Sequence, residues 1–243
     1  AEGLSAPGGR NAPVDMSLDD SNALLLVGLP GSGKSVAVMS IVYQALVKGY
    51  RLAVLDTPAK KTDFAWAKPY VEDHWWGCDD AGTSVAEALT VATLLDEEGK
   101  RLGDLLSEHG VGKWQDLPPA VKSKRENAPI LVVADELANL LSKPNVPAGL
   151  TKEAKALPEF VRMAQDYLEA KLLTLKLNAL VAVHRAAGMR ELYLTQRPSK
   201  TEGFPPELKS LIPHRVLLGP NPSESDVVMA FRDRKRIPAV PAN

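Results

Sequence analysis

Residues 23–35 are ALLLVGLPGSGKS, a run of apolar residues followed by a glycine-rich loop. The short continuous apolar run at 23–28 is typical of a β-strand that is buried on both faces. The next stretch, SVAVMSIVYQALVKG (35–49), has helical spacing of its apolar residues and ends at Lys48-Gly49, a typical helix C-terminus. RLAVLD (51–56) then predicts a second strand. Strand, loop, helix and strand in this order predict an α/β fold with a parallel sheet.

The rest of the chain continues this alternation. We expect further strands at 128–136, 190–196 and 214–219, and helices at 86–108, 157–188 and 223–233. We expect the long helical stretch at 157–188 to be broken near Asn178 or before Gly188. Residues 1–20 are rich in Gly, Pro and Ser, which predicts a flexible linker, with one domain over 21–243.

Composition narrows the function classes. The chain has 243 residues, with 29 Lys and Arg against 30 Asp and Glu, for a net charge of −1. Any contact with nucleic acid must therefore come from local basic loops, because the chain has no global positive field. The single cysteine, Cys78, excludes an internal disulfide and favours a reducing, cytosolic setting. No apolar run approaches the roughly 20 residues needed to span a bilayer. Because the chain begins without Met, we expect it to be a fragment of a longer protein.

The loop GLPGSGKS (28–35) fits the pattern G-x-x-x-x-G-K-[ST] at every fixed position. Glycines let backbone N–H groups curl around phosphate oxygens, and the helix that follows points its positive end at the same charge. Lys34 is expected to reach the β- and γ-phosphates, and the Ser35 hydroxyl to bind Mg²⁺. An ordinary glycine-rich turn is the alternative, which the flanking strand and helix disfavour. The predicted nucleotide-binding residues are Gly28, Leu29, Pro30, Gly31, Ser32, Gly33, Lys34, Ser35 and Val36.

Two other segments supply the remaining chemistry. ILVVADE (130–136) places Asp135 where it can hold Mg²⁺, and Glu136 where it can polarise a water for in-line attack on the γ-phosphate. LYLTQRPS (192–199) ends a strand at Thr195-Gln196, and Gln196 is placed to orient that water. The acids could instead be a first-turn pair favoured by a helix dipole, and Gln196 a solvated strand end. Beside a complete phosphate loop, the pair of acids predicts hydrolysis of a nucleoside triphosphate, which we expect to be ATP.

Three segments in this order, GLPGSGKSVAV (28–38), ILVVADELANLL (130–141) and RAAGMRELYLTQRPS (185–199), resemble the FtsK/SpoIIIE motor domain of the HerA–FtsK superfamily. The similarity covers about residues 12–232. It implies a RecA-like P-loop NTPase fold, in which a central, mostly parallel sheet has helices on both faces. It also implies a ring of subunits, usually six, that pulls double-stranded DNA through a central pore. Such motors serve conjugative DNA transfer and chromosome segregation. Divergent relatives serve type VII protein secretion, and others package viral genomes. The resemblance also implies a cytoplasmic motor whose parent protein is attached to the inner face of the membrane through regions outside this chain.

The resemblance assigns roles to individual residues. Lys34, Ser35, Asp135, Glu136 and Gln196 take the positions of the family's ATP- and Mg²⁺-dependent site. The family also supplies an arginine from one subunit to its neighbour's γ-phosphate, and we expect Arg101 to be this residue; a solvated helix charge is the alternative. Loops that face the pore in the family offer basic residues for DNA phosphates, with exposed surface charges as the alternative. These DNA-contact candidates are Lys143, Lys152, Lys155, Arg197 and Lys200.

Overall fold

The computed structural model describes residues 22–56, 63–71, 76–77, 84–142, 149, 151–199, 204–219 and 223–231. The strands in these residues form one sheet of six, in the order β3-β2-β4-β5-β1-β6, and neighbouring strands are parallel throughout. Their bounds are β1 Ala23–Val27, β2 Arg51–Leu55, β3 Trp76–Gly77, β4 Ile130–Ala134, β5 Met189–Thr195 and β6 His214–Leu217. The predicted α/β class with a parallel sheet is confirmed.

The four central strands are buried on both faces, as their continuous apolar runs predict. Every residue of β1, β2, β4 and β5 is buried. Alternate side chains of a strand point to opposite faces. In β1, for example, Leu25 belongs to one apolar cluster, and Leu24 and Leu26 belong to the cluster on the other face. The sheet is therefore the middle layer of three.

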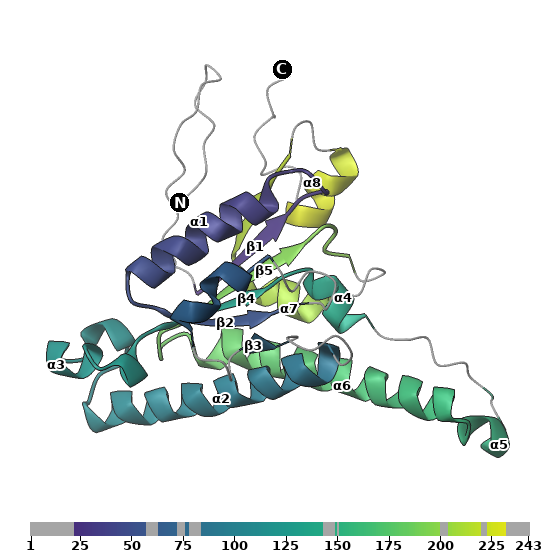
Figure 1. Cartoon of the computed structure of the whole chain (residues 1–243), viewed down its shortest axis with the longest axis horizontal. Coiled ribbons are helices and arrows are strands. Elements are labelled where there is room, and N and C mark those ends of the chain that lie inside the picture. The colour runs from purple at the N-terminus through teal and green to yellow at the C-terminus, as the bar shows by residue number, and fades with distance from the viewer. Residues whose placement is uncertain are drawn as a thin grey trace.

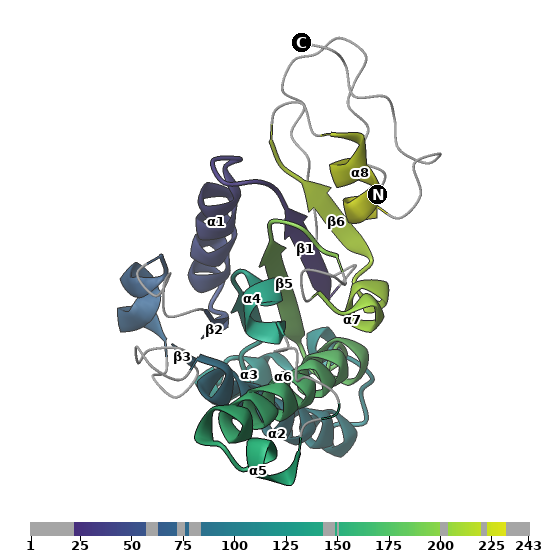
Figure 2. The same cartoon turned by 90° about the vertical axis from the view of Figure 1, so that its right-hand side faces the viewer.

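Helices cover both faces of the sheet (Figures 1 and 2). Helix α1 (Lys34–Val47) and the 3-10 segment η1 (Ala65–Tyr70) pack on one face. The other face carries α2 (Ser84–Glu108), α4 (Leu137–Leu141), α6 (Pro158–Val183) and α7 (Pro206–Leu211). Helix α8 (Glu224–Phe231) contacts the edge strand β6. Short segments complete the fold: η3 (Trp114–Asp116), α3 (Pro119–Lys122), η4 (Arg125–Asn127) and α5 (Lys152–Lys155).

The predicted strands and helices lie within a few residues of those observed. Helix α6 runs without a break through Asn178 and ends at Val183, so of the two expected breaks the one before Gly188 is observed. Leu173, Leu177 and Leu180 give α6 a continuous buried stripe across the position of Asn178, which outweighs the small helix-propensity cost of one Asn. The edge strand β3 and the short helices α3, α4, α5 and α7 were not predicted. The expected linker, 1–20, lies outside the described residues.

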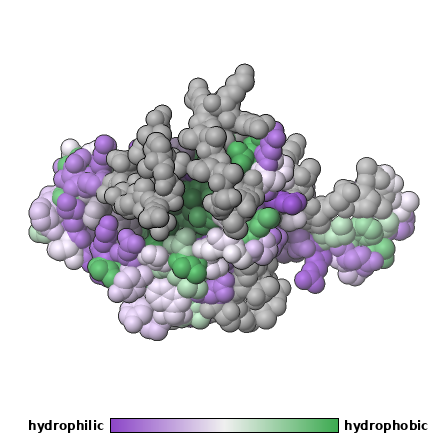
Figure 3. Space-filling model, turned by 90° about the horizontal axis from the view of Figure 1, so that it is seen from above, coloured by the Kyte–Doolittle hydropathy of each residue, from purple (hydrophilic) through white to green (hydrophobic). Residues whose placement is uncertain are grey.

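Helices α5 and α6 project beyond the sheet (Figure 1). Figure 3 shows some hydrophobic (green) surface at this end of the molecule. The projecting half of α6 exposes several large apolar side chains. They are Val161, Tyr167, Leu168 and Leu172. Across the described residues, no helix combines the length and the apolar character that a membrane span requires.

Candidate nucleotide site

The glycine-rich loop joins the carboxyl end of β1 to the start of α1. A Cβ at Gly28 would lie 2.4 Å from Ser32 Oγ and 2.7 Å from the carbonyl oxygen of Leu218, so only glycine fits this close approach. Gly33 caps α1 with a φ of 87°, in the left-handed region that glycine adopts without strain. The hydroxyl oxygen of Ser32 is buried and has no hydrogen-bond partner among the described residues. A tight glycine-rich loop that surrounds a buried hydroxyl without a hydrogen-bond partner is consistent with a phosphate-binding loop.

Lys34 lies inside this loop. It is the first residue of α1, is buried, and donates from Nζ to the carbonyl oxygens of Gly28 and, at 3.4 Å, Leu29. The first turn of α1 contains no acidic residue, so its positive end is not neutralised. Ser35 is exposed beside it. An ammonium group and free helix N–H groups at one point form an anion site.

Asp135 and Glu136 follow β4 directly, at the edge of the sheet that also carries the loop. The backbone N of Asp135 donates to the carbonyl oxygen of Leu55 at 2.9 Å, which holds Asp135 beside the end of β2. Both acids are buried. Glu136 has φ 45° and ψ 52° and caps α4; it is the single non-glycine residue with positive φ in the described part of the chain. A non-glycine residue in the left-handed backbone region destabilises the fold by about 1–3 kcal/mol, and such strained residues are common at functional sites.

Strand β5 lies between β1 and β4, so its end separates the glycine-rich loop from the two acids. Thr195 is the last residue of β5, and Gln196 follows it directly. The backbone N of Gly28 donates to the carbonyl oxygen of Thr195 at 3.3 Å. On the other side, Thr195 Oγ1 and the backbone N of Gln196 donate to Glu136 Oε1 at 3.3 Å and 3.2 Å. The end of β5 thus connects the loop with the acid.

These residues fit Mg²⁺ and a nucleoside triphosphate. The loop and Lys34 would hold phosphate oxygens, and the oxygens of Ser35 and Asp135 are the hard ligands that Mg²⁺ prefers. When bound, the ion supplies positive charge to the transferring phosphoryl group. Leu29, Pro30 and Val36 are exposed beside the loop, where a nucleotide would cover them.

One acid at this edge was not assigned a role from the sequence. Asp56 follows β2 directly and is buried. Leu55, the last residue of β2, pairs with Ala134, the last residue of β4. Asp56 and Asp135 follow these two residues directly, at the same end of adjacent parallel strands. The signal was present in the sequence, as a carboxylate at the end of a buried strand.

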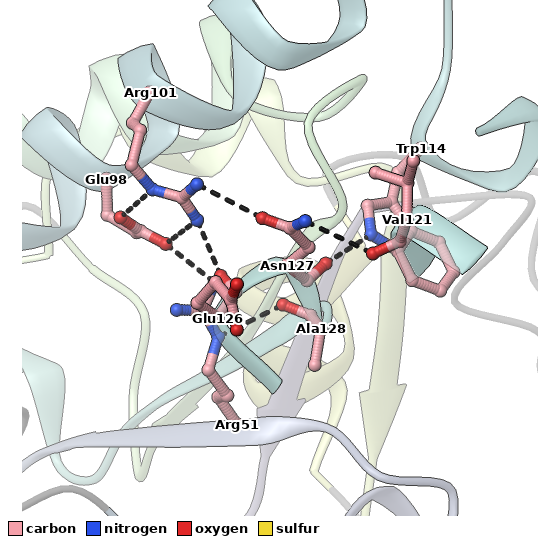
Figure 4. A network of polar contacts seen from close by, with 8 residues as sticks. All are labelled: Arg51, Glu98, Arg101, Trp114, Val121, Glu126, Asn127 and Ala128. Carbon is pink, nitrogen blue, oxygen red and sulfur yellow. Dashed lines mark hydrogen bonds and ion pairs between the residues drawn. The ribbon is translucent and has the colours of Figure 1, made fainter. Parts of the chain in front are cut away.

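Arg101 lies near the amino end of β2, on the side of the sheet opposite the glycine-rich loop. It belongs to the network of polar contacts in Figure 4. Its guanidinium donates to both carboxylate oxygens of Glu98, at 2.8 Å and 2.7 Å, to Asn127 Oδ1 at 3.1 Å, and to the carbonyl oxygen of Glu126 at 2.5 Å. Glu98 also pairs at 2.7 Å with Arg51, the first residue of β2. Burial alone would raise the pKa of Glu98, but hydrogen bonds from Arg101 and Arg51 hold it below its usual value. Arg101 therefore ties α2 to η4 within its own chain.

The DNA-contact candidates that the structure describes lie on two separate segments of the chain. Arg197 is exposed just after β5, beside the nucleotide site. Lys152 and Lys155 are exposed on α5, at the far end of the projection in Figure 1. Lys143 and Lys200 lie outside the described residues.

The sequence matches no protein-family model and no curated protein. Solved structures do match its fold. The pCW3 conjugation coupling protein TcpA, in a monomer form with ATPγS, superposes with a TM-score of 0.69 and 22% identity, over 91% of this chain and 55% of TcpA.

Two further solved structures match with lower TM-scores. EssC (ATPases 2 and 3) from Geobacillus thermodenitrificans has a TM-score of 0.54 and 14% identity, over 92% of this chain and 37% of that one. The cytoplasmic domain of the type VII secretion ATPase EccC from Thermomonospora curvata has 0.53 and 16%, over 89% and 23%. The chain thus spans about half of TcpA and less of the others, and it has the fold of these ATPases. The resemblance to FtsK/SpoIIIE-type motor domains is confirmed at the level of the fold.

Proposed function

We propose that this chain is the ATP-hydrolysing motor domain of a ring-shaped translocase that moves double-stranded DNA. The observation that carries the proposal is the grouping of Lys34, Asp135, Glu136 and Gln196 at one edge of a parallel sheet. Glu136 is held there in a strained backbone conformation with its carboxylate hydrogen-bonded. A chain that only bound a nucleotide would not need the second buried acid.

Hydrolysis at this site follows from the roles of these groups. Lys34 and the loop amides hold the phosphate chain, and Asp135 and Ser35 would hold the Mg²⁺ that neutralises its charge. Glu136 accepts a proton from the attacking water while the water oxygen forms its bond to the γ-phosphorus. The bond from that phosphorus to the bridging oxygen breaks, and ADP leaves with the negative charge on its β-phosphate. The proton is then released with inorganic phosphate.

The choice of DNA as the moved substrate is supported by the comparison with TcpA. This conjugation coupling protein matches with a higher TM-score and identity than the two secretion ATPases. Arg197, exposed beside the site, offers a positive charge to DNA phosphates that would grip without regard to sequence. In this proposal the rings are hexamers, and the parent protein is tethered to the membrane through regions outside this chain.

Secretion of protein is the second candidate. It is supported by the likeness to EssC and EccC, which covers about nine-tenths of this chain in both cases. The near-neutral net charge, −1, does not separate the two substrates.

Turnover of ATP with and without linear double-stranded DNA, across a salt series, tests the choice. We expect DNA to stimulate turnover at about 50 mM salt and the stimulation to fall steeply by about 200 mM, because DNA grip releases counterions. Stimulation by an unfolded polypeptide, and none by DNA at low salt, would favour secretion instead.

Two substitutions test the chemistry. Lys34→Ala should lose nucleotide binding, measured by titration with a fluorescent ATP analogue, because it removes the charge inside the loop. Glu136→Gln should bind the analogue normally and hydrolyse ATP about 100-fold slower or worse, as expected for loss of a general base. Normal turnover by Glu136→Gln would refute the assignment of the base.

A further inference from the structure

The carboxylate of Glu136 is fixed by groups at the end of β5. Its Oε1 atom accepts hydrogen bonds from Thr195 Oγ1 at 3.3 Å and from the backbone N of Gln196 at 3.2 Å. Thr195 is 0% exposed and Glu136 is 4% exposed, so bulk water does not compete for these bonds. In a buried setting a hydroxyl donor has a large influence on where a carboxylate lies.

The backbone of Glu136 is constrained as well. The carbonyl oxygen of Leu55 holds the preceding residue, Asp135, and the backbone N of Asn139 donates to the carbonyl oxygen of Glu136 at 2.8 Å as α4 begins. Between these two points Glu136 adopts its left-handed conformation. The side chain therefore leaves the backbone in a set direction, and Thr195 holds its far end.

Thr195 also touches the phosphate loop. Its carbonyl oxygen accepts the hydrogen bond from the backbone N of Gly28, while its hydroxyl donates to Glu136. One residue thus bridges the loop that would hold the phosphates and the acid that would take the proton. The distance between a phosphate and a base decides whether the water between them is aligned for attack.

We propose that Thr195 is a positioning residue that holds the Glu136 carboxylate in place relative to the phosphate loop. The proposal rests on the proposed function, because it takes Glu136 as the general base of ATP hydrolysis. Thr195 does not touch the reacting atoms; it sets the orientation of the group that does. Its hydroxyl should therefore matter to turnover and not to nucleotide binding.

Four variants separate the hydroxyl from the rest of the side chain. Thr195→Ser keeps the hydroxyl and loses a methyl group, while Thr195→Val keeps the shape and loses the hydroxyl. Thr195→Ala differs from Thr195→Ser by the oxygen atom alone and serves if the Val variant does not fold. Thr174→Val is the matched control. Thr174 is also buried, but its hydroxyl donates to the carbonyl oxygen of Ala170 within α6, away from the site.

The measurements are kcat and KM for ATP in the presence of linear double-stranded DNA, and Kd for a fluorescent ATP analogue. We expect Thr195→Val and Thr195→Ala to lower kcat about tenfold or more, a part of the 100-fold or greater effect of a general base. KM and Kd should stay within about twofold, and Thr195→Ser within about threefold of wild type in kcat. Thr174→Val should keep the wild-type kcat.

The outcomes distinguish this proposal from the proposed function. If Glu136→Gln abolishes turnover while Thr195→Val and Thr195→Ala turn over like wild type, the positioning role is wrong and the base assignment stands. Equal losses in Thr195→Ser and Thr195→Ala would also overturn it, because the hydroxyl would then be irrelevant. A wild-type chain without ATPase activity, or a Glu136→Gln variant with normal activity, would overturn both proposals.

Discussion

Glu191 is a buried carboxyl group in the middle of β5 and is 0% exposed. Burial raises its pKa to about 8, although the charge of Arg190 and a hydrogen bond from Asn22 act in the opposite direction. The Asn22 Nδ2 atom donates to Glu191 Oε2 at 3.2 Å and to the carbonyl oxygen of Val181 at 2.7 Å. At neutral pH Glu191 is therefore protonated and neutral in the folded chain, which avoids the cost of a buried charge.

This raised pKa predicts a loss of stability with increasing pH. Below about pH 4.5 the carboxyl is protonated in both states; between about 4.5 and 8 the unfolded chain releases the proton and the folded chain keeps it. The free energy of unfolding should therefore fall as pH rises through this window. Glu191→Gln cannot ionise, so its free energy of unfolding should not fall in this window. Its stability relative to wild type should therefore increase by on the order of 3 kcal/mol from pH 5 to pH 8.5. Urea unfolding at a series of pH values measures this.

A control substitution removes the same charge at the surface. Glu108 is exposed at the end of α2, and Glu108→Gln should change stability by less than about 0.5 kcal/mol at any of these pH values. If the profiles of Glu191→Gln and wild type run parallel, Glu191 has the same pKa in the folded and unfolded chains.

Helix α6 has one face buried in the protein core and another face exposed to solvent. Leu172 is 50% exposed and Leu173 is 0% exposed, although they are neighbours in one helix. The buried stripe packs against the sheet and against α2, where Asp96 lies buried beside His184. Burial alone would raise the pKa of Asp96. Hydrogen bonds from His184, Lys176 and Lys100 instead hold it well below its usual range, so the carboxylate links α2 to α6.

The two leucines make a matched pair for measuring that packing. Leu173→Ala should lower the free energy of unfolding by about 2–5 kcal/mol, because it removes buried apolar atoms and leaves a cavity. Leu172→Ala should change it by less than about 1 kcal/mol, since the side chain is half in water and Ala favours helix. Chemical denaturation of both variants checks this. Equal losses would mean that the exposed face of α6 is covered in solution.

Elements and site residues were predictable where the signal was local. The glycine-rich loop, the acids after β4 and the end of β5 each carry their chemistry within about ten residues, and parallel strands bring such ends to one edge. The contact of Arg101 with Asn127 was not predictable, because the two residues lie 26 positions apart and meet through the packing of η4 on α2. Nor was the separation of Lys155 from Arg197. The sequence separation of the two residues does not indicate that α5, with Lys155, lies at the projecting end of α6, away from the sheet.

At the scale of the whole molecule, the sheet separates Arg101 from the nucleotide site. Lys34 follows the carboxyl end of β1, whereas Arg101 and Glu98 lie beside Arg51 at the amino end of β2. In a parallel sheet the amino and carboxyl ends of the strands lie on opposite sides, so Arg101 is not at the glycine-rich loop of its own chain. A role in hydrolysis requires a second subunit, arranged head to tail so that different surfaces meet. It also requires Arg101 to exchange Glu98 for a phosphate.

Complementation between two inactive variants tests this arrangement. Lys34→Ala has no working phosphate loop but keeps Arg101; Arg101→Ala keeps the loop but lacks the arginine. If Arg101 acts on a neighbour, each variant alone is inactive. An equal mixture should regain roughly a quarter of the wild-type turnover, from sites that combine one loop with the other's arginine in a head-to-tail ring. A mixture of Lys34→Ala with Glu136→Gln is the control and should stay inactive, because both defects fall in the site of a single chain. If the Arg101→Ala mixture gains nothing although circular dichroism shows that the variant is folded, Arg101 serves only to hold α2 against η4.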